Sequence, residues 1–332
     1  MRKGKWLIFI FLLLVIGYFL GPKPTSSKFS PELPYVPGDM AGISQYIEKK
    51  ESTHRIRPDN QARIIWSNDS AKSRTTYSIV YLHGFSASQA EGEPVHRDIA
   101  KKFGCNLYLA RLAEHGIDTT ESMQKLTVDK YWQSVKEALA IGRQIGNKVI
   151  LMGTSTGGSL ALKLAAEYKD IYALVLLSPN IEINDPNAWV LNNPWGLQVA
   201  RLILGSEYIE SKDKRPIYKQ YWSGKYRIEA AVALQELLET TMTEETFQQV
   251  TQPLLMLYYY KDEIHQDSTV KVSAMKEMFE KLGTPSNKKR SVAMPNTGHH
   301  VIGSYIKSND VEGVKNEIEN FFKDVLKISP VH

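Results

Sequence analysis

Cysteine is almost missing from this chain of 332 residues, because Cys105 is the only one. No internal disulfide can form, so the fold has to be stabilised by its own hydrophobic core. Cys105 lies in the apolar segment CNLYLARL, which predicts a buried structural thiol rather than a nucleophile. A hydrophobic content of 42% is enough for a sizeable core of the kind found in α/β domains.

A strong surplus of basic residues is also missing once the first five residues are set aside. The net charge is +5, and Arg2, Lys3 and Lys5 contribute three of these charges, which leaves +2 for the remainder. Nucleic-acid binding needs clustered Lys and Arg on one face, so we do not expect a nucleic-acid partner. The sequence has no His-Glu-x-x-His and no Gly-x-Gly-x-x-Gly motif, and we therefore expect no metal and no other cofactor.

The first residues, MRKGKWLIFIFLLLVIGYFLGPKP, combine a basic flank with an apolar run from Trp6 to Leu20. Two interpretations are open: a cleaved signal, whose apolar region has about 7 to 15 residues, or an uncleaved anchor, which needs about 20. No pair of small residues suited to cleavage follows the run, and we favour a membrane anchor over residues 1–22. In both cases the basic flank stays in the cytoplasm and the following domain lies outside it, anchored to the membrane or, after cleavage, secreted.

The remainder divides into a spacer with an N-terminal helix, residues 23–60, and a larger domain, residues 61–332. In the larger domain, short apolar runs alternate with helical periodicities, which predicts a mostly parallel sheet with helices on both faces. The rhythm is interrupted at about 181–250, a segment rich in Trp and Tyr that predicts an inserted cap or lid. The expected strands are ARIIWSN, YSIVYLHG, NLYLARL, KVILMGTS, YALVLLSPN, PLLMLYYY and KRSVAMP.

A serine flanked by glycines occurs in LMGTSTGGSL, residues 151–160. A polar turn is one interpretation, because Gly, Ser and Thr are common in turns. The apolar run before it and the helical periodicity after it favour a nucleophile elbow instead, with Ser155 at a strand-to-helix turn. Side chains at Gly153 and Gly157 would then collide with the neighbouring strand and helix. The N–H of Thr156 lies at a helix N-terminus, where it suits an oxyanion.

Together with this turn, the segments YLHGFSAS and ARLAEHGID resemble the α/β-hydrolase family, and more narrowly its carboxylesterases and monoacylglycerol-lipase-like members. The similarity runs from about Tyr77 to the C-terminus. It implies an α/β-hydrolase fold in which Phe85, the third residue of a His-Gly-Phe segment, donates a backbone N–H to the oxyanion hole. It also implies structural roles for His83 and His115. In this family the chain order of the triad is Ser, acid, His.

The serine needs a histidine to accept its proton and a carboxylate to orient that histidine. In LLMLYYYKDEIHQDSTV, Asp262 comes immediately beyond a strand, where the resemblance implies the acid. Asp267 is interpreted as the N-cap of the next helix. In MPNTGHHVIGS, the His-Val-Ile ending favours His300 as the base, whereas an alignment on the glycine selects His299.

These residues predict a serine hydrolase that cleaves carboxylic esters through an acyl-enzyme intermediate, with a small acyl ester as its substrate. Thioesterases, peptidases and acyltransferases share the same constellation and differ in the pocket. An inactive, membrane-anchored binding protein on the same fold is the alternative outside enzymes. The presence of all three triad residue types argues against that alternative.

Overall fold

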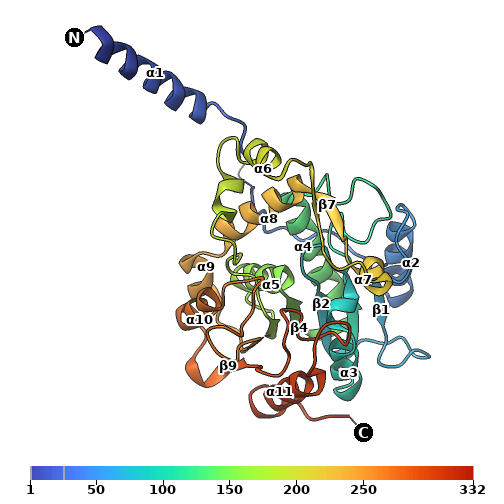
Figure 1. The fold of residues 1–332 in the computed structure, drawn as a ribbon. Coiled ribbons are helices and arrows are strands. Elements are labelled where there is room, and N and C mark those ends of the chain that lie inside the picture. The colour runs from blue at the N-terminus through green and yellow to red at the C-terminus, as the bar shows by residue number, and fades with distance from the viewer. Residues whose placement is uncertain (1, 25–26, 332) are drawn as a thin grey trace.

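A computed structural model describes residues 2–24 and 27–331 of the chain; residues 1, 25, 26 and 332, which include parts of the predicted anchor and spacer, lie outside this description. The centre of the fold is a seven-stranded sheet with the order β1-β3-β2-β4-β5-β8-β9 (Figure 1). All neighbouring strands are parallel except β1, which pairs with β3 in the antiparallel sense at one edge. Each expected strand segment forms one of these strands: β1 (Arg63–Ile65), β2 (Thr75–Leu82), β3 (Asn106–Leu109), β4 (Gly146–Thr154), β5 (Ala173–Leu177), β8 (Leu254–Tyr258) and β9 (Lys289–Ala293).

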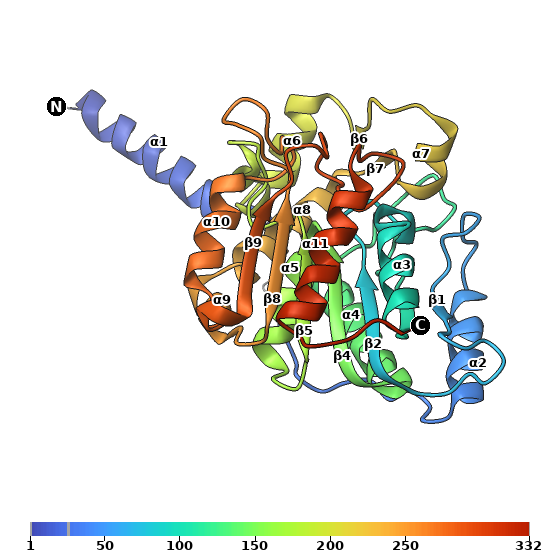
Figure 2. The ribbon, with the colours of Figure 1, turned by 90° about the horizontal axis from the view of Figure 1, so that it is seen from below.

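Helices cover both faces of the sheet, as the alternating pattern predicts. Successive side chains of a strand point to opposite faces. In β2, Val80 and Leu82 therefore pack into one hydrophobic cluster, and Ile79 and Tyr81 pack into another. The first cluster includes side chains from α2 (Met40–Glu51), α4 (Val128–Ile145), α5 (Thr156–Glu167) and α10 (Val272–Lys281). The second includes α3 (Val95–Lys102) and α11 (Val311–Asp324), which Figure 2 shows on the same side of the sheet, and the buried Cys105. The fold class is confirmed.

A long excursion separates β5 from β8. It contains η2 (Ala188–Asn192), α6 (Gly196–Leu204), β6 (Tyr208–Glu210), α7 (Pro216–Tyr221), β7 (Lys225–Arg227), α8 (Ile228–Thr241) and α9 (Glu244–Gln249). Strands β6 and β7 form a separate antiparallel pair. Ala230, Ala233 and Leu237 of α8 belong to the main hydrophobic cluster, so the excursion is packed onto the body of the domain.

Helix α1 (Arg2–Phe19) extends away from the rest of the chain in both views (Figures 1 and 2). Its apolar side chains are exposed over most of the length from Trp6 onward. Trp195 contacts the C-terminal end of α1 and the residues that follow it. Its indole N–H donates to Gly17 O at 3.0 Å, and its backbone N–H donates to Pro22 O at 2.9 Å. Within the described part of the chain, no helix has the combined length and hydropathy of a membrane-spanning segment.

Candidate active site

Ser155 lies in a strained turn between β4, which ends at Thr154, and α5, which begins at Thr156. Its backbone has φ 53° and ψ −121°, a conformation that residues with a side chain rarely adopt. A Cβ on Gly157 would lie 1.9 Å from Leu82 O, and a Cβ on Gly153 would lie 2.5 Å from the backbone of Gly157. Only glycine fits at both positions, which is the steric reason for the Gly-x-Ser-x-Gly pattern.

Ser155 lines a cavity of about 530 Å³ between the carboxyl ends of the strands and the excursion after β5. Phe85, His299 and His300 line the same cavity, as does Glu91, which sequence reasoning missed. The excursion contributes most of the apolar wall: Ala188, Leu191, Ile209, Tyr218, Trp222, Tyr226, Ala231 and Leu234. Tyr218, Trp222 and Tyr226 of the predicted cap therefore line this cavity.

Two buried histidines fix the turn that carries Phe85. His83 Nε2 accepts a hydrogen bond from Leu112 N–H, and His115 Nε2 accepts one from Ser86 N–H, each at 3.1 Å. Burial lowers the pKa of His83 to about 4 and that of His115 well below its ordinary value, so both rings are neutral. Both histidines thus shape this loop, in agreement with the structural roles that the resemblance implies.

Two backbone N–H groups are available to an oxyanion beside Ser155. Thr156 is the first residue of α5, so its N–H has no preceding helical turn to bond. Phe85 N–H donates to no other protein group within residues 2–24 and 27–331. Among the described residues, the two N–H groups predicted for an oxyanion hole therefore have no competing protein acceptor.

The structure pairs His300 with Asp267, not with Asp262. His300 Nδ1 lies 2.6 Å from Asp267 Oδ2, and the two side chains are 7% and 0% exposed. Asp262 is half exposed and bonds to His265, three residues along the chain. The prediction that Asp262 orients the histidine is wrong. The interpretation of Asp267 as a helix N-cap is also wrong, because α10 begins at Val272 with Lys271 as its N-cap.

The loop after β8 explains why the nearer aspartate is the wrong one. Tyr260 and Gln266 form an isolated antiparallel bridge, which extrudes residues 261–265 toward solvent. Asp267 N–H then donates to Tyr259 O at 3.2 Å. Asp267 therefore lies next to the end of β8, whereas Asp262 lies away from it in the extruded segment. The only sequence signal for this return is the Asp-Ser-Thr-Val segment, typical of an aspartate that bonds its own loop. Asp267 Oδ1 indeed accepts the N–H groups of Thr269 and Val270.

The electrostatics of the buried pair favour a charged histidine next to a charged aspartate. Burial by itself lowers the pKa of His300, but the charge and hydrogen bond of Asp267 outweigh it and raise the pKa above its ordinary value. Burial raises the pKa of Asp267, and His300 with the two loop N–H groups brings it below its usual range. Because the Asp267 carboxylate accepts a hydrogen bond from Nδ1–H, Nε2 of His300 is left free to accept a proton.

His299 differs from its neighbour in both contacts and charge. Its Nδ1 accepts a hydrogen bond from Val301 N–H at 3.0 Å. Burial and the nearby charge of Lys307 lower its pKa to about 4, so its ring is neutral at physiological pH. Of the two adjacent histidines, His300 is therefore the one that has a carboxylate partner.

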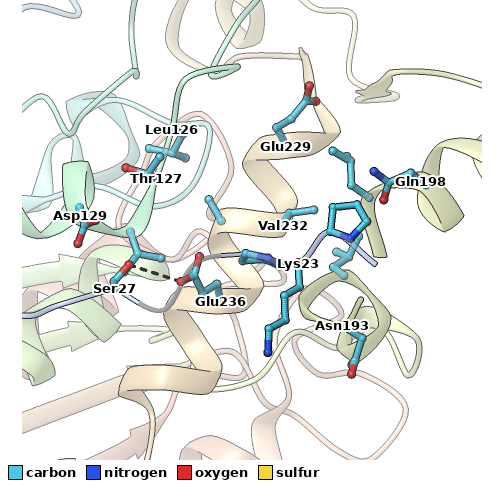
Figure 3. A pocket seen from close by; sticks show the side chains of 16 residues that line it. Lys23, Ser27, Leu126, Thr127, Asp129, Asn193, Gln198, Glu229, Val232 and Glu236 are labelled. Atoms are coloured by element: carbon cyan, nitrogen blue, oxygen red, sulfur yellow. Dashed lines mark hydrogen bonds between the residues drawn. The ribbon is translucent and has the colours of Figure 1, made fainter. Parts of the chain in front are cut away.

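The part of the chain that the structure describes contains other pockets but no candidate metal site. Among the described residues, no group of three or more His, Cys, Asp or Glu side chains is arranged to hold a metal ion. A second pocket, of about 340 Å³, lies where the segment after α1 meets α8 (Figure 3). Lys23, Ser27 and Glu236 line it, with a 3.4 Å hydrogen bond from Ser27 to Glu236, but none of the predicted site residues does.

The profile of the Hydrolase_4 family, described as serine aminopeptidase S33, matches residues 75–303, more than half of the chain. The chain belongs to this family. Ser155, Asp267 and His300 all lie within the matched region of this α/β-hydrolase, and α1 and the spacer lie outside it. Over 105 residues the hydrolase is 30% identical to the thermostable monoacylglycerol lipase of Bacillus sp. (strain H-257), covering 32% of this chain. The chain thus spans about two fifths, 41%, of that curated relative.

Solved structures share the fold of this hydrolase at low sequence identity. A structure of the metagenome-derived lipolytic enzymes LipS and LipT has a TM-score of 0.64 at 16% identity, covering 81% of this chain and 99% of that one. The monoacylglycerol lipase of Paleococcus ferrophilus has a TM-score of 0.58 at 15% identity, covering 79% and 98%. Est1E from Butyrivibrio proteoclasticus, with ferulic acid bound, has a TM-score of 0.54 at 16% identity, covering 80% and 95%.

Proposed function

We propose that this hydrolase cleaves carboxylic esters through an acyl-enzyme intermediate. Ser155 Oγ attacks the ester carbonyl while His300 Nε2 takes the hydroxyl proton, and the N–H groups of Phe85 and Thr156 hold the oxyanion. His300 then gives the proton to the leaving alkoxide. A water molecule, activated by the same histidine, attacks the acyl-enzyme and releases the acid. Asp267 holds the ring of His300 and stabilises its protonated form.

The observation that carries this proposal is the buried His300–Asp267 pair, in which His300 lines the same cavity as Ser155. A serine hydroxyl becomes a nucleophile when an oriented base removes its proton. Burial fixes the orientation, because neither partner of the pair can exchange its hydrogen bond for one to bulk water. The apolar wall from the excursion after β5 suits an acyl chain, in keeping with the lipases and esterases among the similar proteins.

Peptide-bond cleavage is the second candidate, because the matching family profile is described as a serine aminopeptidase. The same three side chains serve both reactions. The two candidates differ in the leaving group, so aminoacyl nitroanilides placed beside nitrophenyl and monoacylglycerol esters in one panel distinguish them. We expect turnover of the esters to exceed that of the nitroanilides.

The test of the proposal combines this panel with a fluorophosphonate probe on the full chain. Ser155→Ala should abolish labelling and lower ester turnover about 10⁴-fold or more, leaving the rate that the oxyanion hole and binding supply. Ser178→Ala is the matched control, because Ser178 also has a positive φ, of 47°, at the end of the adjacent strand β5. A wild-type chain with neither turnover nor labelling would favour the binding-protein alternative.

We also propose that the chain attaches to a membrane through α1, with the hydrolase domain outside the cytoplasm. Exposed apolar side chains on α1 support this, together with a second exposed group on and near α6: Trp189, Trp195, Val199, Leu202, Ile203 and Leu204. Trp195 links the two groups through its hydrogen bonds to Gly17 and Pro22. Full-length protein should sediment with membranes, and deletion of residues 1–22 should release it. A soluble product whose N-terminus lies near residue 22 would indicate a cleaved signal instead.

A further inference from the structure

Glu91 is a buried carboxyl group in the cavity that the proposed reaction does not use. It lies in the short helix η1 (Gln89–Gly92) and is 3% exposed. Its Oε2 accepts a hydrogen bond from the N–H of Gly84, the residue directly before Phe85. Burying a carboxyl group is costly unless it has hydrogen-bond partners, and this partner belongs to the turn that presents the predicted oxyanion donor.

The carboxyl group of Glu91 and the side chain of Ser155 approach the same point from two sides. A Cβ placed on Gly84 would lie 2.8 Å from Glu91 Oε2 and 2.9 Å from Ser155 Cβ. Helix η1 is also tied to the loop after His300, because Ser304 Oγ donates to Ala90 O at 2.7 Å. Glu91 therefore stands where the oxyanion turn, the serine and the histidine loop meet.

Among the titratable groups near Glu91, His300 is its main electrostatic partner at neutral pH. Tyr81 of β2, Tyr131 of α4 and Tyr218 of α7 also interact with its charge, but burial raises the pKa of each, so they stay neutral. Burial raises the pKa of Glu91 to about 7. The Gly84 hydrogen bond, the charge of His300 and a hydrogen bond with the Trp222 side chain act in the opposite direction and lower it. The charge of Glu91 in turn helps to raise the pKa of His300.

We propose that Glu91 is a positioning residue of this site, which fixes the Gly84–Phe85 turn by its hydrogen bond and favours the protonated form of His300 by its charge. The kinetic part of this inference rests on the proposed function. The two effects have separate signatures. Without the hydrogen bond, Phe85 N–H is no longer oriented toward the oxyanion, and we expect kcat to fall more than KM changes. Loss of the charge alone moves the pKa of His300.

Glu91→Gln and Glu91→Ala separate the two effects. An amide oxygen at position 91 can still accept from Gly84 N–H, so Glu91→Gln should retain more of the rate than Glu91→Ala. We expect Glu91→Ala to lower kcat about tenfold or more with a smaller change in KM, as misplacement of a catalytic group does. Glu93→Gln is the matched control, because Glu93 lies two residues away and pairs with Arg97 at 2.6 Å outside the cavity.

The pKa of His300 is the decisive readout, measured in the full chain by NMR of the imidazole signals and assigned by comparison with His300→Ala. We expect Glu91→Gln to lower it by about 0.5 to 1 unit, in line with the removal of one nearby charge, and Glu93→Gln to leave it unchanged. This titration needs no ester turnover, so it tests the inference even if the proposed reaction is wrong. An unchanged pKa of His300 in Glu91→Gln would overturn the role of the charge. Equal rates in Glu91→Gln and Glu91→Ala would overturn the role of the hydrogen bond.

Discussion

Two histidine–aspartate pairs lie on the loops beyond β8 and β9, and they differ in almost everything except residue type. His300 and Asp267 are 33 residues apart in the chain, buried, and joined at 2.6 Å. His265 and Asp262 are three residues apart, with side chains 61% and 49% exposed, and joined at 2.9 Å. The local pair contains Asp262, the aspartate that the sequence favours as the acid. The histidine of the distant pair is the one that lines the cavity with Ser155.

The difference teaches that burial, rather than proximity along the chain, makes such a pair useful for catalysis. An exposed pair is screened by water and can exchange its partner for solvent, so it contributes little to orientation. A buried pair holds one ring orientation, and the aspartate charge acts at full strength on the histidine. Three predictions test this comparison, in order of decreasing effect.

The largest effect is expected at the buried histidine. His300→Ala should lower kcat for a short-chain ester about 10⁴-fold or more, because the base of a triad acts as a unit with its serine. His299→Ala should cost about tenfold or less, through loss of the bond to Val301 N–H and of cavity packing. Steady-state rates at pH 8, with folding checked by circular dichroism, decide between them. If His299→Ala were the inactive variant, the glycine-anchored alignment would be the right one.

An intermediate effect is expected in the pH profile. His300 must be neutral to accept a proton, so kcat/KM should be low at acidic pH and rise as the pH passes the pKa of His300. That pKa is raised by Asp267, so the acidic limb should lie above the ordinary histidine value of about 6.5. Asp262→Asn should leave the limb in place. A displaced limb in that variant would mean that the exposed aspartate acts on the base after all.

The smallest effect is expected at the exposed histidine. His265→Ala removes a ring that is 61% exposed and bonds only to its own loop in the described structure, through Asp262. Turnover should stay within about twofold of the wild type, as is usual for surface substitutions away from buried features. Kinetics on the same ester measure this, with His54→Ala, another exposed histidine, as the control. A tenfold loss of turnover in His265→Ala would contradict the claim that only the buried pair matters for catalysis.

The sequence was sufficient where a local pattern has one physical solution. Alternating apolar runs and helical periodicities located every strand of the main sheet. The Gly-x-Ser-x-Gly pattern identified the strained turn, because no other residue fits at positions 153 and 157. The His-Val-Ile ending selected, of two adjacent histidines, the one that the structure pairs with a carboxylate.

The sequence was insufficient to identify site residues whose position depends on the path of a loop. Asp262 is closer to the strand end along the chain, yet the bridge between Tyr260 and Gln266 turns it out into solvent. No local pattern marks Glu91 either, because its importance arises only when η1 packs against Gly84 and Ser155. Both errors concern carboxylates whose role depends on how segments outside the regular strands and α-helices pack together.

The most direct test of the account compares Asp267→Asn with Asp262→Asn in kcat for one ester at pH 8. Asparagine keeps the size of the side chain but removes the charge that stabilises protonated His300. It also leaves the tautomer of His300 unfixed. We predict that Asp267→Asn lowers kcat about 10³- to 10⁴-fold, the loss expected for a triad aspartate, and that Asp262→Asn stays within about twofold of the wild type. A large loss in Asp262→Asn with a nearly normal rate in Asp267→Asn would contradict the assignment of the buried pair.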